Sequence, residues 1–422
     1  MKKITLTLLI IIISYFAEAQ SAINLDSCYA KARQQYPLIK QKGLIEKTKE
    51  YNVTNAGRGY LPQVNFNGQA TYQSDVTTIP LNFHLPGLNI SIPTVSKDQF
   101  NVHGEVDQTI YDGGVIKQQK ESQIAAASIQ DENIEVQLYA LKDRINQIYF
   151  GTLLIDAQLK QNDVTQKDIQ NSIDRMQANV NNGTALSSNL YELKAALLQQ
   201  KQNEISLKAS RKAYLDMLSL FINKQLDEST VLETPKTVSV SESIHRPELS
   251  YYDYQKKNDD VQEKMLKATN RPKFMFFFQG GYALPGLNGF DINPAWYYLT
   301  GVKLSWSLGG LYTLHNQKQV INIDRQTIDI QKETFLFNTN VSLKQQSAEF
   351  LKLKQMIAID NDIITQRTAV KDISKAQLDN GVITVHDYLS ELDAEDAAKQ
   401  SLLLHQVQLL MDEYNYQNTA GN

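Results

Sequence analysis

The sequence predicts a mixed α and β membrane protein, in which long antiparallel helices form an α-barrel and four strands per chain contribute to a β-barrel shared between copies. Three observations carry this prediction. One is a proline-free run of 68 residues at 115–182, the second is two pairs of segments with alternating polarity, and the third is the recurrence of this pattern in both halves of the chain.

Residues 1–19 have the organisation of a signal peptide. Lys2 and Lys3 precede an apolar run at 4–13, and small residues suited to a signal peptidase follow at 17–19. The apolar run is too short to span a bilayer as a helix, and no later segment resembles a transmembrane helix. We expect export with cleavage after Ala19, and any membrane insertion must then use strands.

The first structural repeat is expected at 20–235. Its strands are expected at about 63–73 and 99–110, and its helices at about 24–58, 115–182 and 187–222. Pro37 breaks or restarts the first helix, because proline lacks the amide hydrogen that a helix interior needs. The helix at 115–182, bracketed by glycines, would be roughly 100 Å long at 1.5 Å per residue.

The spacing of apolar residues separates helix from strand. In the helix at 115–182 a stripe with spacings of three and four suits packing against another helix, and it consists of Leu138, Leu141, Ile145, Ile148, Thr152, Ile155 and Leu159. The strands alternate instead, with Asn65, Asn67, Gln69, His103 and Glu105 on their polar faces. Those polar faces suit a water-filled interior, although alternation alone would also fit a soluble core.

The second structural repeat is expected at 236–422. Its strands are expected at about 273–283 and 296–307, and its helices at about 245–270, 311–380 and 385–417. Pro37 and Pro62 recur as Pro247 and Pro272, both 210 residues later, and the glycine that ends the long helix recurs as well. A duplication explains this order economically.

Trp296 and Trp306 lie ten residues apart on one face of the expected last strand. At about 3.3 Å per residue and a tilt near 40°, their vertical separation is roughly 25 Å, the height of the apolar band of an outer-membrane barrel. We therefore expect them in the two aromatic girdles.

Four strands cannot close a barrel, because the smallest outer-membrane barrels have about eight. Open edges are not tolerated in lipid, so several copies must share one barrel. The helices at 24–58 and 187–222, stacked end to end, match the length of the helix at 115–182. Each repeat can then supply one long helix beside a composite one, and a ring of such pairs forms a hollow cylinder.

Composition and motifs exclude several functions. The net charge is −4 without a basic run, so nucleic acid is not an expected partner. The one cysteine, Cys28, excludes an intrachain disulfide and a cysteine-based zinc site, and we expect it at a buried helix position. The six histidines are scattered, and phosphate-binding or serine-elbow motifs are absent from the sequence. We expect no enzyme activity, catalytic residue, metal or cofactor.

The order of several motifs resembles that of the outer membrane efflux protein family, the TolC-like channels. These motifs are Tyr36-Pro37, Leu61-Pro62, Asp112-Gly113-Gly114, Arg246-Pro247-Glu248-Leu249 and the turns at Gly183 and Gly381. The resemblance covers essentially the whole mature chain. It implies a homotrimer with a twelve-stranded barrel in outer-membrane lipid and a helical tunnel in the periplasm. It also implies the exit channel of a tripartite efflux pump or type I secretion system, with a periplasmic adaptor (membrane fusion protein) and an inner-membrane pump of the RND, ABC or MFS type.

The resemblance further implies roles for the two turns. Asp387 corresponds to a family aspartate that narrows the periplasmic entrance, and the matching position of the first repeat is Asn189. A second acidic position is Ser390 here, and the tyrosine and arginine that tether the closed entrance in the family correspond to Leu378 and Ile383. The positions where adaptor hairpins would dock are Gly183, Thr184, Ala185, Leu186, Gly381, Val382, Ile383 and Thr384.

The alternative is an exported periplasmic coiled-coil adaptor or structural protein without a pore. Such a protein does not need four strands with apolar faces, or two tryptophans at girdle spacing. These features favour the channel.

Overall fold

The computed structural model describes residues 22–78, 94–238, 241, 243–289 and 291–422. The expected signal peptide at 1–19 lies outside the described residues, as do Pro80, Pro86 and Pro93 between the first two expected strands. The chain divides into two compact units, and each draws on both halves of the sequence. We name them the helical unit, Met1–Lys42, Glu132–Ser250 and Lys332–Asn422, and the sheet unit, Gly43–Asp131 and Tyr251–Gln331.

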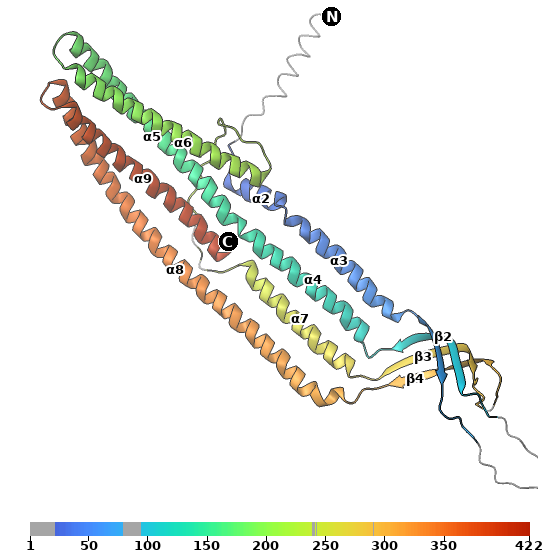
Figure 1. The fold of residues 1–422 in the computed structure, drawn as a ribbon. Helices are drawn as coiled ribbons and strands as arrows, with labels where there is room; N and C mark the ends of the chain where they lie inside the picture. Colours follow the sequence, from blue (N-terminus) through green and yellow to red (C-terminus); the bar gives the residue numbers. More distant parts are fainter. Residues whose placement is uncertain (1–21, 79–93, 239–240, 242, 290) are drawn as a thin grey trace, which may run out of the picture. The chain divides into compact units, whose positions relative to one another are not determined.

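Eight α-helices and four strands are assigned in the described part of the chain (Figure 1). The helices are α2 (Leu25–Gln35), α3 (Ile39–Gly57), α4 (Val115–Tyr139), α5 (Leu141–Asn181), α6 (Ser187–Ile222), α7 (Pro247–Thr269), α8 (Gly310–Asp379) and α9 (Val385–Ala420). The strands are β1 (Gln63–Tyr72), β2 (Asp98–Tyr111), β3 (Lys273–Leu284) and β4 (Ala295–Ser305), and a 3₁₀ turn, η1 (Arg58–Tyr60), precedes β1. Within the described ranges, no helix combines the length and apolar character needed to cross a bilayer.

Two of the predicted helices are divided. The helix expected at 24–58 becomes α2 and α3, because Tyr36 is extended (φ −61°, ψ 129°) and the ring of the following proline disfavours the helical region there. The helix expected at 115–182 becomes α4 and α5 at Ala140, whose φ of −63° and ψ of −13° stay close to helical values. The helix expected at 311–380 is unbroken, and α8 contains 70 residues.

The sheet unit contains one antiparallel sheet with the strand order β1-β2-β3-β4. Val64 of β1 lies opposite Val106 of β2, which lies opposite Phe278 of β3, which lies opposite Thr300 of β4. β1 and β4 are therefore the two edges of the sheet. The strands begin and end within two residues of their predicted positions.

The predicted apolar stripe forms the core of the helical unit. Six of its seven residues are at most 7% exposed, and only Leu159 is partly exposed. The stripe lies on the end of α4 and on α5, and α5 packs against α2, α6 and α9. Burial of each large aliphatic side chain contributes about 1.5–3 kcal/mol to the stability of the fold, so this stripe holds the helices together.

α8 and α9 also meet at a pair of carboxylates. Burial, and then the nearby Glu349, raise the pKa of Asp412 to about 6. Between the ordinary pKa of about 4 and this value, the folded chain keeps a proton that the unfolded chain has lost. The free energy of unfolding therefore falls as the pH rises through this window, and it stays lower above pH 6.

Asp412→Asn is accordingly expected to stabilise the protein at pH 8 and to change its stability little at pH 4. The expected gain at pH 8 is about 1–2 kcal/mol per chain, after allowance for solvent screening of the partly exposed carboxylate. Thermal unfolding of the wild type and the variant at both pH values measures this difference. An equal change at the two pH values would show that Asp412 does not carry this proton.

Candidate functional site

Two turns of the same geometry connect α5 to α6 and α8 to α9, at the tips of the two helical hairpins. Gly183 and Gly381 have φ values of +74° and +71°, a left-handed conformation that glycine adopts without a steric penalty. The backbone amide of Thr184 donates to the carbonyl of Asn179 at 2.9 Å, and that of Val382 donates to Gln377 at 2.8 Å. Both turns are thus closed by the same helix-terminating hydrogen bond.

The predicted docking residues divide into an exposed and a packed group. Leu186 and Val382 are 71% and 69% exposed, so each turn presents an apolar side chain to its surroundings. Gly183, Thr184, Gly381 and Thr384 are also exposed. Ala185 and Ile383 instead pack against the core beneath the turns.

In the helical unit the hairpins α5–α6 and α8–α9 lie side by side (Figure 1), and that core joins them to each other. Its buried residues are Ile169, Ile173, Met176, Leu190, Leu193, Leu378, Val385, Tyr388 and Leu392. The hydroxyl of the fully buried Tyr388 lies 3.3 Å from the hydroxyl oxygen of Ser172 on α5. Leu378 is buried in this core and Ile383 packs against it, so both side chains serve packing.

Asp387 caps the start of α9. Its carboxylate accepts hydrogen bonds from the backbone amide and the hydroxyl of Thr384, at 3.0 and 2.6 Å, and its own amide donates to the Thr384 hydroxyl at 3.1 Å. These hydrogen bonds lower the pKa of Asp387, so the exposed carboxylate stays ionised. Asn189 occupies the first turn of α6, where the N-cap, Leu186, makes no side-chain cap. Of these two positions, only Asp387 carries a charge.

Two polar contacts tie the hairpins together near the turns. Arg175 of α5 pairs with Asp379 of α8 at 2.6 Å, and Nδ1 of His386 on α9 lies 3.6 Å from a carboxylate oxygen of Glu192 on α6. Sequence reasoning missed both, because the members of each pair are about two hundred positions apart and no local pattern marks them.

The sheet has one polar and one apolar face, as the alternation predicts. On the polar face Nδ1 of His103 lies 2.9 Å from Oδ1 of Asn101, which also accepts from the Tyr297 hydroxyl at 2.9 Å. Gln279 donates to Tyr297 at 3.3 Å, and Asn67 lies 3.5 Å from the other ring nitrogen of His103. This network crosses all four strands and was not predicted.

The apolar face carries aromatic side chains. The rings of Tyr282 and Trp296 are 5.1 Å apart, and Trp296 is 82% exposed. β4 ends at Ser305, so Trp306 follows the strand instead of lying within it as expected. Its indole nitrogen donates to the carbonyl of Asn270, which follows α7, at 3.1 Å. This hydrogen bond holds Trp306 in the connection between β4 and α8. The Trp306 side chain is nevertheless 53% exposed.

Over the described ranges, no group of three or more His, Cys, Asp or Glu side chains is arranged to hold a metal ion. The exposed turns and the two-faced sheet are the candidate functional surfaces.

Comparison with known proteins adds a family and a fold. The model of the outer membrane efflux protein family matches residues 28–223. The outer membrane protein VceC from Vibrio cholerae is 13% identical with a TM-score of 0.65, covering 94% of this chain and 96% of its own. CusC, described as forming a transmembrane channel, is 13% identical with a TM-score of 0.68, covering 95% and 92%. The Neisseria gonorrhoeae MtrE outer membrane channel in its open state is 14% identical with a TM-score of 0.64, covering 94% and 89%. No curated protein matches the sequence.

Proposed function

We propose, since the chain belongs to the outer membrane efflux protein family, that this outer membrane efflux channel is the passive exit duct of a tripartite efflux pump or type I secretion system. The protein resides in the outer membrane, with its helical part in the periplasm. An inner-membrane pump of the RND, ABC or MFS type would deliver substrates through a periplasmic adaptor. We also propose that residues 1–19 are removed on export and that 20–235 and 236–422 arose by duplication.

The observation that carries this proposal is a four-stranded sheet with two edges, one polar face and one apolar face. In lipid the edge strands need partners, because unpaired backbone groups cost several kcal/mol each. Three copies would supply twelve strands, a number within the range of outer-membrane barrels. The network around His103 and Tyr297 would then face the water-filled interior, and Trp296 would face lipid.

We assign the adaptor-docking role to the turns at 183–186 and 381–384. Their exposed leucine and valine suit an apolar contact, and their glycine geometry fixes the backbone that a partner would meet. The ties Arg175–Asp379 and His386–Glu192 would hold the two hairpins together when the entrance is closed, in the place of the family's polar tether.

Asp387 would form a ring of three carboxylates at that entrance and favour cations. Asp387→Asn in planar bilayers is expected to reduce the cation-over-anion preference at least two-fold, because the amide removes the charge and keeps a hydrogen-bond acceptor for the helix cap. Thr384→Ala is the matched control, since it breaks the cap and leaves the charge in place. If the wild-type protein forms no ion-conducting pore, the proposed channel function is wrong. If the ion selectivity changes equally in Asp387→Asn and Thr384→Ala, the charge of Asp387 does not act at the entrance.

A further inference from the structure

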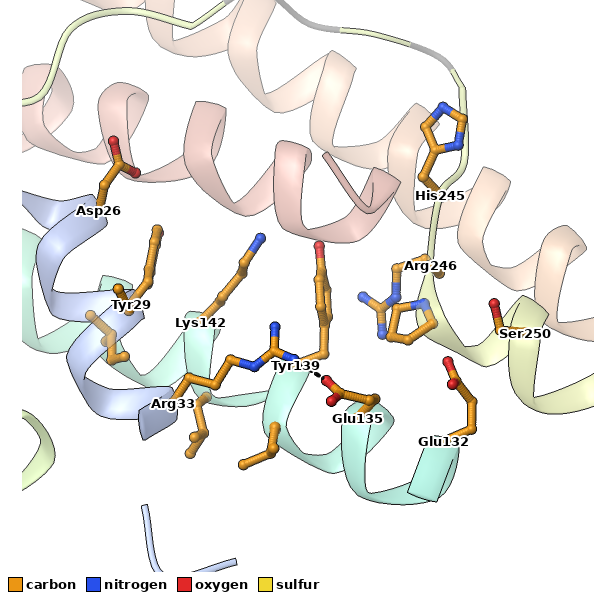
Figure 2. A pocket seen from close by; sticks show the side chains of 15 residues that line it. Asp26, Tyr29, Arg33, Glu132, Glu135, Tyr139, Lys142, His245, Arg246 and Ser250 are labelled. Carbon is orange, nitrogen blue, oxygen red and sulfur yellow. Dashed lines mark hydrogen bonds and ion pairs between the residues drawn. The ribbon is translucent and has the colours of Figure 1, made fainter. Parts of the chain in front are cut away.

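Four side chains of the helical unit form an alternating row of rings and cations (Figure 2). Nζ of Lys142 lies 5.8 Å from the ring centre of Tyr29 and 4.6 Å from that of Tyr139. The guanidinium of Arg246 lies 4.6 Å from the ring centre of Tyr139. One tyrosine ring is therefore in contact with two cations, and each contact contributes about 0.5–1 kcal/mol or more where water is excluded.

The neighbouring cations have carboxylate partners. Arg246 forms an ion pair with Glu248 through two hydrogen bonds. Arg33, which Figure 2 shows reaching across from α2, pairs with Glu135 at 2.6 Å. Glu135 also accepts from Lys42. These charges are balanced within the fold.

Lys142 differs from them. Among the described residues, its ammonium has no Asp or Glu side chain within ion-pair distance, and its one hydrogen bond is a long one of 3.5 Å to a backbone oxygen of Asn422, the last residue of the sequence. An ammonium has three N–H donors, so most of its donor capacity is open. Burial, together with the charge of Arg246, lowers the pKa of Lys142. A partly buried cation with open donors favours an anion.

The tyrosine hydroxyls are already occupied. The hydroxyl of Tyr29 donates to Asn146, and that of Tyr139 donates to the carbonyl of Asn418 at 3.0 Å. The two rings thus present mainly their apolar surfaces. They line a half-open cleft of about 530 Å³, together with Leu138, Ile145 and Pro247. This volume lies in the range of sites for small organic molecules.

We propose that this cleft binds a small organic carboxylate, whose anionic group pairs with Lys142 and whose apolar body lies against the rings of Tyr29 and Tyr139. Asp26 and Glu132 also line the cleft and would repel a ligand with a second negative charge. The fitting ligand is therefore a monoanion with an apolar or aromatic body. None of the residues that line the cleft belongs to the two turns or to a strand, and the site assigns this protein a ligand in addition to its transported substrates.

The test uses the full-length mature protein in detergent and 4-fluorobenzoate as the probe. Fluorine NMR of the probe measures its binding. Binding with a Kd near the millimolar range is expected for the wild type. Lys142→Met is expected to weaken it at least ten-fold, and Lys142→Arg by less than about three-fold, since charge is retained and geometry changes. Lys160→Met, an exposed lysine on the same helix α5, is expected to leave binding unchanged. The neutral 4-fluorobenzamide should not bind.

Equal binding of the benzamide, or wild-type affinity in Lys142→Met, would overturn the proposal, as would the absence of any benzoate binding by the wild type. Because Lys142→Met could fail to fold, a second measurement uses the wild type alone. Acylation of Lys142, mapped by mass spectrometry, is expected to slow at least five-fold with benzoate and not with benzamide. An unchanged rate with benzoate would also overturn the proposal.

Discussion

Arginine in place of Phe66 is expected to abolish the outer-membrane trimer, whereas arginine in place of the adjacent Asn67 is not. Phe66 lies on the apolar face of β1 and is 79% exposed in the single chain, so its replacement removes little packing within the protein. If that face meets lipid, an arginine at mid-membrane costs roughly 2–4 kcal/mol, and three copies carry that cost in each trimer.

Asn67 provides a matched control in the same strand. It lies opposite His103 on the polar face, where arginine would project into water. The amount of heat-modifiable trimer in the outer-membrane fraction, measured on gels with and without boiling, is expected to fall at least ten-fold for Phe66→Arg and to stay near wild type for Asn67→Arg. Loss of trimer in the Asn67 variant alone would assign the faces the opposite way.

Glutamate at both Leu186 and Val382 is expected to reduce export at least ten-fold while the trimer remains in the membrane. Both side chains are largely exposed, so their replacement leaves the core beneath the turns intact. An adaptor that docks on them would have to bury six unpaired carboxylates per trimer, and each unpaired buried charge is strongly unfavourable.

The measurement is complementation of a deletion strain in a dye-accumulation or secretion assay, with trimer quantified in parallel. Leu186→Gln with Val382→Thr is the control, because these residues are similar in size and uncharged, and export should fall much less. Normal export in the glutamate variant would exclude the turns as the docking surface. Loss of trimer would show that the two residues serve assembly.

Local patterns were sufficient to predict most of the fold. The spacing of Leu141, Ile145 and Ile148 on one stripe predicts their burial, and the alternation of asparagines with apolar residues in β1 predicts its two faces. The glycines at 183 and 381 mark the turns, since few other residues adopt positive φ there. The break at Ala140 and the end of β4 before Trp306 have no such marker in the local sequence.

The candidate sites were less accessible to sequence reasoning. The capping interaction of Asp387 with Thr384 is local, and its spacing of three residues could have indicated it. The contacts of Arg175 with Asp379, and of Tyr297 with Asn101, join residues about two hundred positions apart. The open ammonium of Lys142 is likewise defined by three separate segments, so only the folded chain brings its surroundings together.

The most direct measurement of the central claim is disulfide cross-linking between the two edges of the sheet. In a Cys28→Ala background, which removes the single native cysteine, one cysteine replaces Leu299 on β4 and a second is moved residue by residue along β1. If neighbouring copies close one barrel, one register of this scan will give a covalently linked trimer on non-reducing gels of outer-membrane samples. A scan that yields only monomers, or only disulfides within a single chain, would contradict the shared barrel and the channel that depends on it.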